Sequence, residues 1–134
     1  FMARHLEGLL KDAKIPPMID QVEMHPFLQR RALKDYCQEQ RIQVEAFSPL
    51  ARGRRLNDPV LKDIAQRNGR TVPQIMLRWS IQKGLIPIPK TSKKEKLIED
   101  ISALDFKLPN NDISAMDSLE EGYRTTTWDP HELP

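Results

Sequence analysis

Short apolar runs that alternate with helical segments constrain this chain more than any other feature of its sequence. The runs cover residues 18–24, 42–47 and 85–88, and stretches with apolar side chains three or four residues apart separate them. Strands that alternate with helices are joined by crossovers, so they pair in parallel. The sequence therefore predicts an α/β fold built on a parallel sheet.

Turn and cap residues mark where the predicted helices begin and end. Asp58–Pro59 supplies a cap and a first-turn proline, and Asn68–Gly69 ends that helix. Thr71 opens the next helix in the same way, and Gly84 ends it. The segment 48–55, with its proline and glycine, is predicted to be a loop without regular structure. The other helices are expected at residues 3–13, 29–40, 94–102 and 110–119.

The composition excludes several classes of partner. Charged residues make up 30% and aromatic residues 6% of the chain, which is typical of a globular protein. The net charge of +2 gives no general attraction to nucleic acid or to anionic lipid. No run of 18 apolar residues predicts a membrane span. We therefore expect neither nucleic acid nor a membrane as a partner.

The cysteine and histidine content limits redox and metal chemistry. Cys37 is the only cysteine, which excludes an internal disulfide and suits a reducing, cytoplasmic location. It lies in a helical pattern, where a small buried side chain is favoured over a reactive thiol. No histidine has a partner at the spacing of metal ligands, so no metal site is predicted.

The end of the third apolar run carries the clearest sign of a ligand. Lys90, Thr91 and Ser92 follow the run, and a helix begins shortly after them. Ammonium and hydroxyl groups beside the free N–H groups of a helix start are suited to a phosphate. A buried strand followed by a solvated basic turn is the alternative, because short charged runs usually face solvent.

Three parallel strands do not complete a sheet. A parallel sheet is normally covered on both faces and a barrel has no free edge, so three strands alone expose apolar surface and unpaired backbone groups. We expect the isolated chain to associate or to be unstable.

Four segments, at residues 1–10, 21–26, 45–50 and 88–100, carry motifs in a fixed order and at fitting separations. In that order they resemble the carboxyl-terminal part of the aldo-keto reductase family. The resemblance implies a TIM (β/α)₈ barrel, of which residues 1–134 form a single incomplete domain with about three βα units, strands six to eight. It also implies an NADPH-dependent oxidoreductase that reduces aldehydes and ketones to alcohols, with NADPH lying across the carboxyl ends of the strands.

The resemblance assigns the nicotinamide end of the cofactor to the first two strands. Gln21 matches the glutamine that holds the carboxamide, since an amide offers both a donor and an acceptor. Phe47 matches the aromatic residue on which the nicotinamide ring stacks. Ser48 and Leu50 match the start of the loop along the pyrophosphate, to which the arginines at positions 52, 54 and 55 could add charge. Without the resemblance, a solvated glutamine and a core phenylalanine are the simpler interpretations.

The phosphate and adenine end of the cofactor is assigned to the third strand and its helix. Lys90, Thr91 and Ser92 match the group that receives the 2′-phosphate. Lys96 stands where the family usually has an arginine, and Glu99–Asp100 stands where Glu-Asn contacts adenine. Lysine lacks the planar fork of arginine and a carboxylate lacks donors, so weaker cofactor binding is predicted.

The family's catalytic tetrad of Asp, Tyr, Lys and His comes from the first four strands of the barrel, and no segment of this sequence matches it. His25, which precedes a proline at a strand end, is interpreted as a turn residue. No catalytic residue is predicted, and the chain alone is expected to be inactive. The tail at residues 120–134 is implied to lie on the substrate side, with Trp128 contacting a small carbonyl substrate.

The open strands predict a partner. Either the missing amino-terminal half of the barrel or a second copy of the chain is expected to cover them. The alternative function is a truncated, non-catalytic nucleotide-binding or interaction protein that self-associates for the same reason.

Overall fold

A computed structural model describes residues 1–128 and 130–132 of the chain. Its sheet has three parallel strands in the order β1-β2-β3, which confirms the predicted α/β arrangement. The strands are β1 Ile19–Glu23, β2 Gln43–Phe47 and β3 Ile86–Ile88. Each is slightly shorter than the apolar run that predicted it.

The described residues form six α-helices. They are α1 Ala3–Asp12, α2 Arg31–Glu39, α3 Pro59–Arg67, α4 Val72–Gln82, α5 Lys94–Ile101 and α6 Asn110–Asp117. Three short 3₁₀ turns accompany them, at η1 Ala51–Gly53, η2 Ser102–Leu104 and η3 Pro130–Glu132. The segment 48–55 therefore contains one 3₁₀ turn where only a loop was predicted. The predicted helix 94–102 ends one residue earlier, and the helix predicted to reach residue 119 ends at Asp117.

The helix starts have the caps that the sequence predicts. The Asp58 carboxylate accepts hydrogen bonds from the backbone N–H groups of Val60 at 3.0 Å and Leu61 at 3.2 Å. Thr71 and Gln74 form a reciprocal capping box, with distances of 2.9 and 3.4 Å. These bonds satisfy N–H groups that the first turn of a helix cannot pair internally.

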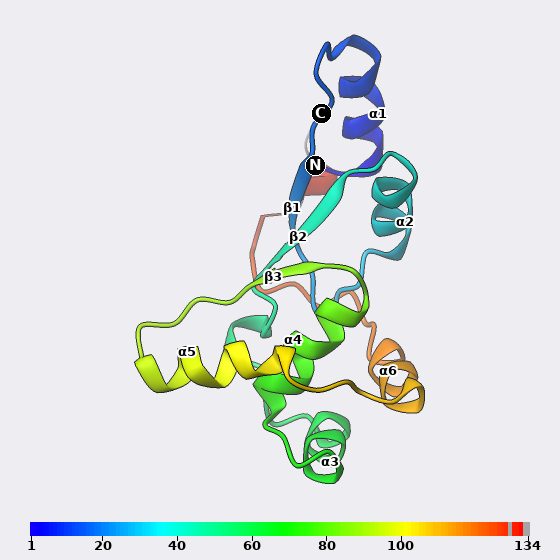
Figure 1. Cartoon of the computed structure of the whole chain (residues 1–134). Coiled ribbons are helices and arrows are strands. Elements are labelled where there is room, and N and C mark those ends of the chain that lie inside the picture. The colour runs from blue at the N-terminus through cyan, green and yellow to red at the C-terminus, as the bar shows by residue number, and fades with distance from the viewer. Residues whose placement is uncertain (129, 133–134) are drawn as a thin grey trace.

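The helices are distributed unevenly around the sheet. Figure 1 shows α1 and α2 beside β1 and β2, while α3, α4, α5 and α6 gather around the other end of the molecule near β3. Large, fully buried side chains from the helices and from the segment after β1 form the core: Met24, Phe27, Leu61, Ile64, Ile75, Met76, Trp79 and Met116. Among the described residues, no helix has both the length and the apolar character needed to cross a bilayer.

The two faces of the sheet differ in burial. Val22, Val44 and Ala46 face the helices and are buried. On the opposite face, the register places Gln21 beside Glu45 and Glu45 beside Ile86. Gln21 and Ile86 are exposed, because no helix of the described chain covers this face of the sheet and the tail covers it only at the end of β1, over Glu23. Side chains alternate along a strand, so every second residue of each strand lies on this uncovered face.

Helix α5 is the least buried of the helices. It contacts α4, yet it has no buried residue. Leu97, Ile98 and Ile101 are about 60% exposed, at 60%, 59% and 61%. An apolar stripe of this kind is usually covered in a folded protein, so α5 and β3 together form the open side of the molecule.

Candidate functional site

The uncovered face of the sheet and the carboxyl-terminal tail enclose one small cavity. Gln21, Phe47 and Trp128 all line it, so the structure brings together three residues that the sequence assigns to cofactor and substrate. The cavity measures about 10 Å³, roughly the space that one water molecule needs. The tail therefore packs closely against the ends of β1 and β2.

Gln21 and Phe47 reach this cavity from different depths of the sheet. Phe47 is the last residue of β2, whereas Gln21 is the third of the five residues of β1. The Gln21 side-chain amide donates a hydrogen bond to Glu45 Oε1 at 2.6 Å. Gln21 pairs with Glu45 across the strands, and Phe47 is two residues after Glu45 on the same strand. The side chains of Gln21 and Phe47 therefore lie on the same face of the sheet, the uncovered one.

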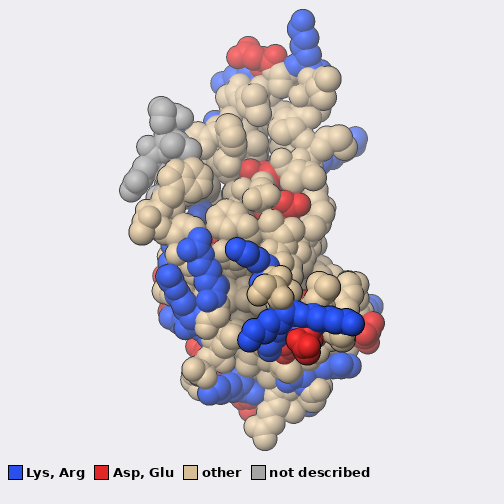
Figure 2. Space-filling view, turned by 90° about the vertical axis from the view of Figure 1, so that its left-hand side faces the viewer, with Lys and Arg blue, Asp and Glu red and all other residues tan. Residues whose placement is uncertain are grey.

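Lys90, Thr91 and Ser92 lie at a second location, between β3 and α5. The Thr91 hydroxyl accepts a hydrogen bond from the N–H of Lys93 at 3.1 Å, and Lys93 is the residue that precedes α5. Lys90 and Ser92 are exposed. Figure 2 shows Lys and Arg side chains gathered on the side of the molecule that carries α5. Ammonium groups and the unpaired N–H groups of a helix start are thus available at the carboxyl end of β3.

Lys96 and Glu99 bind each other. Their side chains are 2.6 Å apart, and this hydrogen bond raises the pKa of Lys96. Burial alone would raise the pKa of Glu99, but hydrogen bonds from Lys96 and Thr71 outweigh it and lower the pKa. Burial, together with the nearby Glu99, raises the pKa of Asp100. The Glu99 carboxylate therefore holds Lys96 in place on the surface of α5.

The loop after β2 is folded tightly. Ser48, Ala51 and Arg52 all have positive φ angles, of 49°, 47° and 52°, and Gly53 follows with 75°. Left-handed conformations in non-glycine residues are uncommon, and such positions cluster at ligand-binding sites. The resemblance implies that this loop lies along the pyrophosphate.

Two arginines of this loop contact the tail. The Arg55 guanidinium lies 4.3 Å from the centre of the Phe27 ring and 5.0 Å from that of Tyr123, and it pairs with Glu121 at 2.7 Å. Arg54 donates a long hydrogen bond of 3.4 Å to the backbone oxygen of Thr125. Both arginines, which were predicted to add charge at a pyrophosphate, contact the tail in this structure.

Known proteins identify the family. Residues 1–121 match the model of the aldo/keto reductase family. The chain belongs to this family. The glyoxal reductase of Bacillus subtilis (strain 168) is 44% identical over 133 residues, which are 99% of this chain and 48% of that protein. The 9,11-endoperoxide prostaglandin H2 reductase of Trypanosoma cruzi (strain CL Brener) is 38% identical over 127 residues, which are 92% of this chain and 45% of that protein.

Solved structures of aldo-keto reductases share the fold of this chain. An aldo-keto reductase from a Medee basin deep-sea metagenome library matches with a TM-score of 0.91 and 36% identity, over 95% of this chain and 48% of that chain. An aldo-keto reductase crystallised with NADPH matches with a TM-score of 0.86 and 31% identity, over 94% of this chain and 42% of that chain. The aldo/keto reductase chain described here spans about half the length of the relatives it matches.

Sequence reasoning missed the residue that fixes the tail of this aldo/keto reductase chain. The Glu23 side chain is 2% exposed, and its Oε1 accepts hydrogen bonds from the Thr125 hydroxyl and, at 2.8 Å, from the Thr125 N–H. Its Oε2 accepts from the Thr126 hydroxyl at 3.0 Å. Burial would raise the pKa of Glu23, but these bonds lower it, so the carboxylate stays ionised. A carboxylate beside buried strand positions requires donors, and the run of threonines in the tail could have indicated them.

His25 lies beside Glu23 and is fully buried. Its Nε2 is 3.4 Å from Glu23 Oε1, and neither ring nitrogen forms a hydrogen bond within the described part of the chain. Burial lowers the pKa of His25 despite the neighbouring carboxylate, so the ring is neutral near pH 7. His25 and Leu28 form a short antiparallel bridge, in keeping with the turn that the sequence predicts.

The described residues offer neither an exposed thiol nor a cluster of metal ligands. Cys37 is buried, as predicted, and burial raises the pKa of its thiol to about 11. Within the described residues, no group of three or more His, Cys, Asp or Glu side chains could hold a metal ion.

The residues at the strand ends fit the chemistry of a phosphorylated nicotinamide cofactor. Exposed ammonium groups and a helix start without a side-chain cap lie beyond β3, which suits phosphate oxygens. An aromatic side chain and a primary amide lie on the uncovered face at β2 and β1, which suits a flat ring with a carboxamide.

Proposed function

We propose that this chain is the cofactor-binding part of an NADPH-dependent reductase that converts aldehydes or ketones to alcohols. The observation that carries the proposal is the position of Phe47 and Lys90 at the carboxyl ends of neighbouring parallel strands. Sites of α/β barrels lie at that end of the strands. The similarity to reductases, one of them crystallised with NADPH, supports the choice of cofactor.

Each candidate residue has a distinct task in this proposal. When bound, the cofactor supplies hydride to the carbonyl carbon. Gln21 pairs with the carboxamide and Phe47 stacks on the nicotinamide ring, which fixes the face that the ring presents. Ser48 and Leu50 lie along the pyrophosphate. The set Lys90, Thr91, Ser92, Lys96, Glu99 and Asp100 receives the 2′-phosphate and the adenosine, and Trp128 forms part of the wall on the substrate side.

We assign no acid or base to this chain. In the proposal, residues 1–134 form one incomplete domain that contributes strands six to eight of the barrel, and residues 120–134 belong to the substrate side. The remaining half of the barrel covers the uncovered face of the sheet and supplies the proton for the alcohol. A cytoplasmic location is part of the proposal, because the one thiol is buried and unpaired.

A reconstituted enzyme tests the proposal. The chain is combined with the amino-terminal half of the Bacillus subtilis glyoxal reductase, and NADPH oxidation is followed with a small aldehyde. Lys90→Ala is expected to weaken NADPH by about ten- to a hundredfold and NADH far less, because one charge-assisted contact to the 2′-phosphate is lost. Lys96→Arg is expected to tighten NADPH, because it restores a planar fork.

Lys62→Ala is the matched control, because Lys62 is an exposed lysine on α3, away from the strand ends. Equal losses of NADPH and NADH binding in Lys90→Ala would mean that this lysine supports the fold and does not recognise the 2′-phosphate. No binding of either cofactor to the reconstituted protein would contradict the proposal as a whole.

The second candidate is a non-catalytic protein that self-associates, and the exposed apolar residues of β3 and α5 favour it. Ile86, Ile88 and Leu97 are exposed at 44%, 37% and 60%. Sedimentation of the chain alone distinguishes the two candidates. A stable dimer that rejects the amino-terminal half of a relative would favour self-association.

A further inference from the structure

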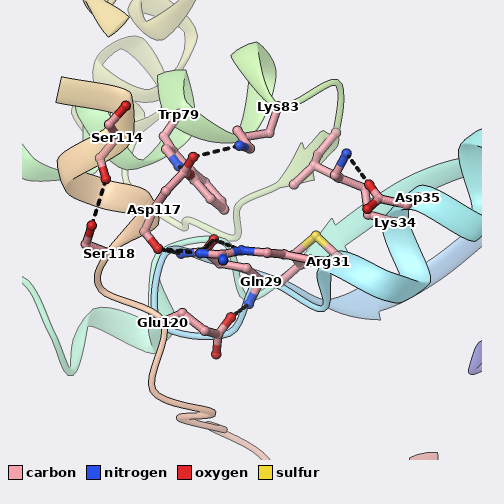
Figure 3. Close-up of a pocket in the computed structure, with 12 residues that line it drawn as sticks. Gln29, Arg31, Lys34, Asp35, Trp79, Lys83, Ser114, Asp117, Ser118 and Glu120 are labelled. Atoms are coloured by element: carbon pink, nitrogen blue, oxygen red, sulfur yellow. Dashed lines mark hydrogen bonds and ion pairs between the residues drawn. The ribbon is translucent and has the colours of Figure 1, made fainter. Parts of the chain in front are cut away.

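A groove runs along the side of the sheet that faces the helices, away from the proposed cofactor site. Its upper part lies between α2, α4 and α6 and measures about 800 Å³ (Figure 3). Its lower part lies between α2 and α4 and measures about 470 Å³. Lys34, Lys83 and Leu85 line both parts, so the two are continuous. Both volumes lie within the range of small-molecule sites.

The groove has a firm apolar base. Trp79, Met24 and Leu85 line its upper part and are buried, at 1%, 0% and 5% exposure. Ile42 and Val44 line its lower part and are buried too. The base belongs to the core, so the shape of the groove is set by packing that the rest of the fold requires.

The carboxylates of the upper part are already used. Asp117 accepts hydrogen bonds from Trp79 Nε1 and from Lys83 Nζ, both at 2.8 Å. Glu120 accepts from the backbone N–H groups of Gln29 and Gly122. Figure 3 shows Asp117 turned toward Trp79 and Lys83, and Glu120 turned toward Gln29. Asp35, the third carboxylate there, contacts Lys34 at 3.0 Å, so each carboxylate that lines the upper part has a partner among the described residues.

The lower part contains charges of one sign only. Its charged lining residues are Lys34, Arg41 and Lys83, and the polar ones beside them are the amides Gln38, Gln43 and Gln82. Lys34 contacts Asp35, whose side chain is 64% exposed and does not line the lower part. In the part of the chain that the structure describes, the Arg41 guanidinium has no hydrogen bond or ion pair. Lys83 reaches Asp117 of the upper part at 2.8 Å, so among the described residues Arg41 is the cation of the lower part that has no carboxylate partner.

The backbone at Arg41 gives independent evidence. Three helices end in the same way, with a left-handed residue directly after the C-cap. After α3 and α4 this residue is a glycine, Gly69 with φ 62° and Gly84 with φ 77°. After α2 it is Arg41, with φ 60°. The two residues after each C-cap form equivalent backbone hydrogen bonds to the preceding turn.

Glycine is the favoured residue at such a position, because a side chain there strains the backbone. The chain places an arginine where two of its own helices use glycine. A cation also interacts favourably with the dipole at a helix C-terminus, and this interaction could explain the charges of Arg41 and Lys83 without any ligand. Lys34 lies near the middle of α2, away from the helix C-terminus, and contacts Asp35 at 3.0 Å.

We propose that the lower part of the groove binds a small polyanion with two phosphate groups, held by Lys34, Arg41 and Lys83. Ammonium and guanidinium groups are the side chains that recognise phosphate oxygens, and the neighbouring amides can donate to the remaining oxygens. The proposal does not depend on the proposed function, since the groove and Phe47 lie on opposite faces of β2.

Inorganic pyrophosphate is the probe, titrated calorimetrically into the chain at about 0.15 M ionic strength. Arg41→Gly is the decisive variant. It should retain or raise the melting temperature, because glycine accepts the left-handed backbone, and should weaken pyrophosphate by about tenfold or more. Lys34→Gln should weaken it by a similar factor. Lys62→Gln, an exposed lysine on α3, is the matched control and should change nothing.

Lys90→Ala separates this site from the proposed cofactor site. Pyrophosphate binding that survives Lys90→Ala and is lost in Arg41→Gly supports the groove. The proposal is overturned if wild-type chain binds no pyrophosphate, or if Arg41→Gly leaves the affinity unchanged. Loss of binding only in Lys90→Ala would also overturn it, because the probe would then occupy the strand ends.

Discussion

Two regions of the molecule differ in whether the chain itself supplies the partners of their side chains. One is the junction of β1 with the tail, and the other is the arm formed by β3 and α5. At the junction, a buried carboxylate, Glu23, satisfies two threonines of the tail within the chain itself. On the arm, Leu97 and Ile101 extend into solvent, and α5 has no buried residue. The two regions contain the two ends of the proposed cofactor site.

This difference shows what a piece of a barrel can stabilise alone. Residues close in the fold complete one another's hydrogen bonds wherever both partners are present. Apolar stripes remain exposed where the described chain has no element to cover them. Helix α5 is an example, because it cannot keep its contact with α4 and at the same time turn its apolar stripe toward the core. Stability is therefore expected to be concentrated around α4 and the strand ends of β1.

The largest expected effect is a difference in the free energy of unfolding between a core substitution and a substitution on the open arm. Trp79→Ala removes a fully buried ring whose Nε1 donates to Asp117, and should destabilise the chain by about 3–5 kcal/mol. Leu97→Ala on the open arm should change the free energy of unfolding by less than about 0.5 kcal/mol. Urea unfolding monitored by circular dichroism measures both. Similar losses in the two variants would show that α5 is packed in solution, for example against a second copy.

A smaller effect is expected at the junction. Glu23→Gln keeps the shape of the side chain but loses the charge that strengthens three hydrogen bonds, and should cost about 1–2 kcal/mol. The tail should then exchange its amide hydrogens faster than wild type, while α4 stays protected. Hydrogen exchange read by mass spectrometry provides the measurement. Unchanged exchange at residues 123–128 would mean that other contacts hold the tail.

The smallest effect concerns pH. The lowered pKa of His25 means that, below pH 6.5, the unfolded chain binds a proton that the folded chain does not. Stability should therefore fall as the pH decreases from 6.5 toward the folded pKa, with a slope of at most about 1.4 kcal/mol per pH unit. His25→Leu should flatten this part of the profile. Glu23 acts at lower pH, since its pKa lies below 4.5, so a slope that persists between pH 5 and 6.5 in His25→Leu would assign it to another group.

Local sequence patterns were sufficient for the elements of the fold. Apolar runs and caps such as Asp58 and Thr71 act within a few residues, so the strands, their parallel pairing and most helix starts could be predicted, whereas several helices end one or two residues earlier than expected. Arg41 shows where such reasoning stops. The residues beside Arg41 in the sequence do not indicate that its backbone adopts a left-handed conformation.

The site was predictable only where one strand or one turn defines it. Lys90 could be placed after β3, and Phe47 at the end of β2, because each strand is defined by the residues next to it in the sequence. The partners of Glu23 lie about a hundred residues away along the chain, at Thr125 and Thr126. Long-range pairs of this kind depend on how the tail returns to the sheet, which periodicity does not encode.

The contacts of Arg55 with both Phe27 and Tyr123 have a mechanical consequence. One guanidinium joins the segment after β1, the loop after β2 and the tail, and Glu121 fixes it from the side. The tail cannot swing outward while this arginine keeps both rings. Loss of this guanidinium would therefore loosen three segments from one another at once: the one after β1, the loop after β2 and the tail.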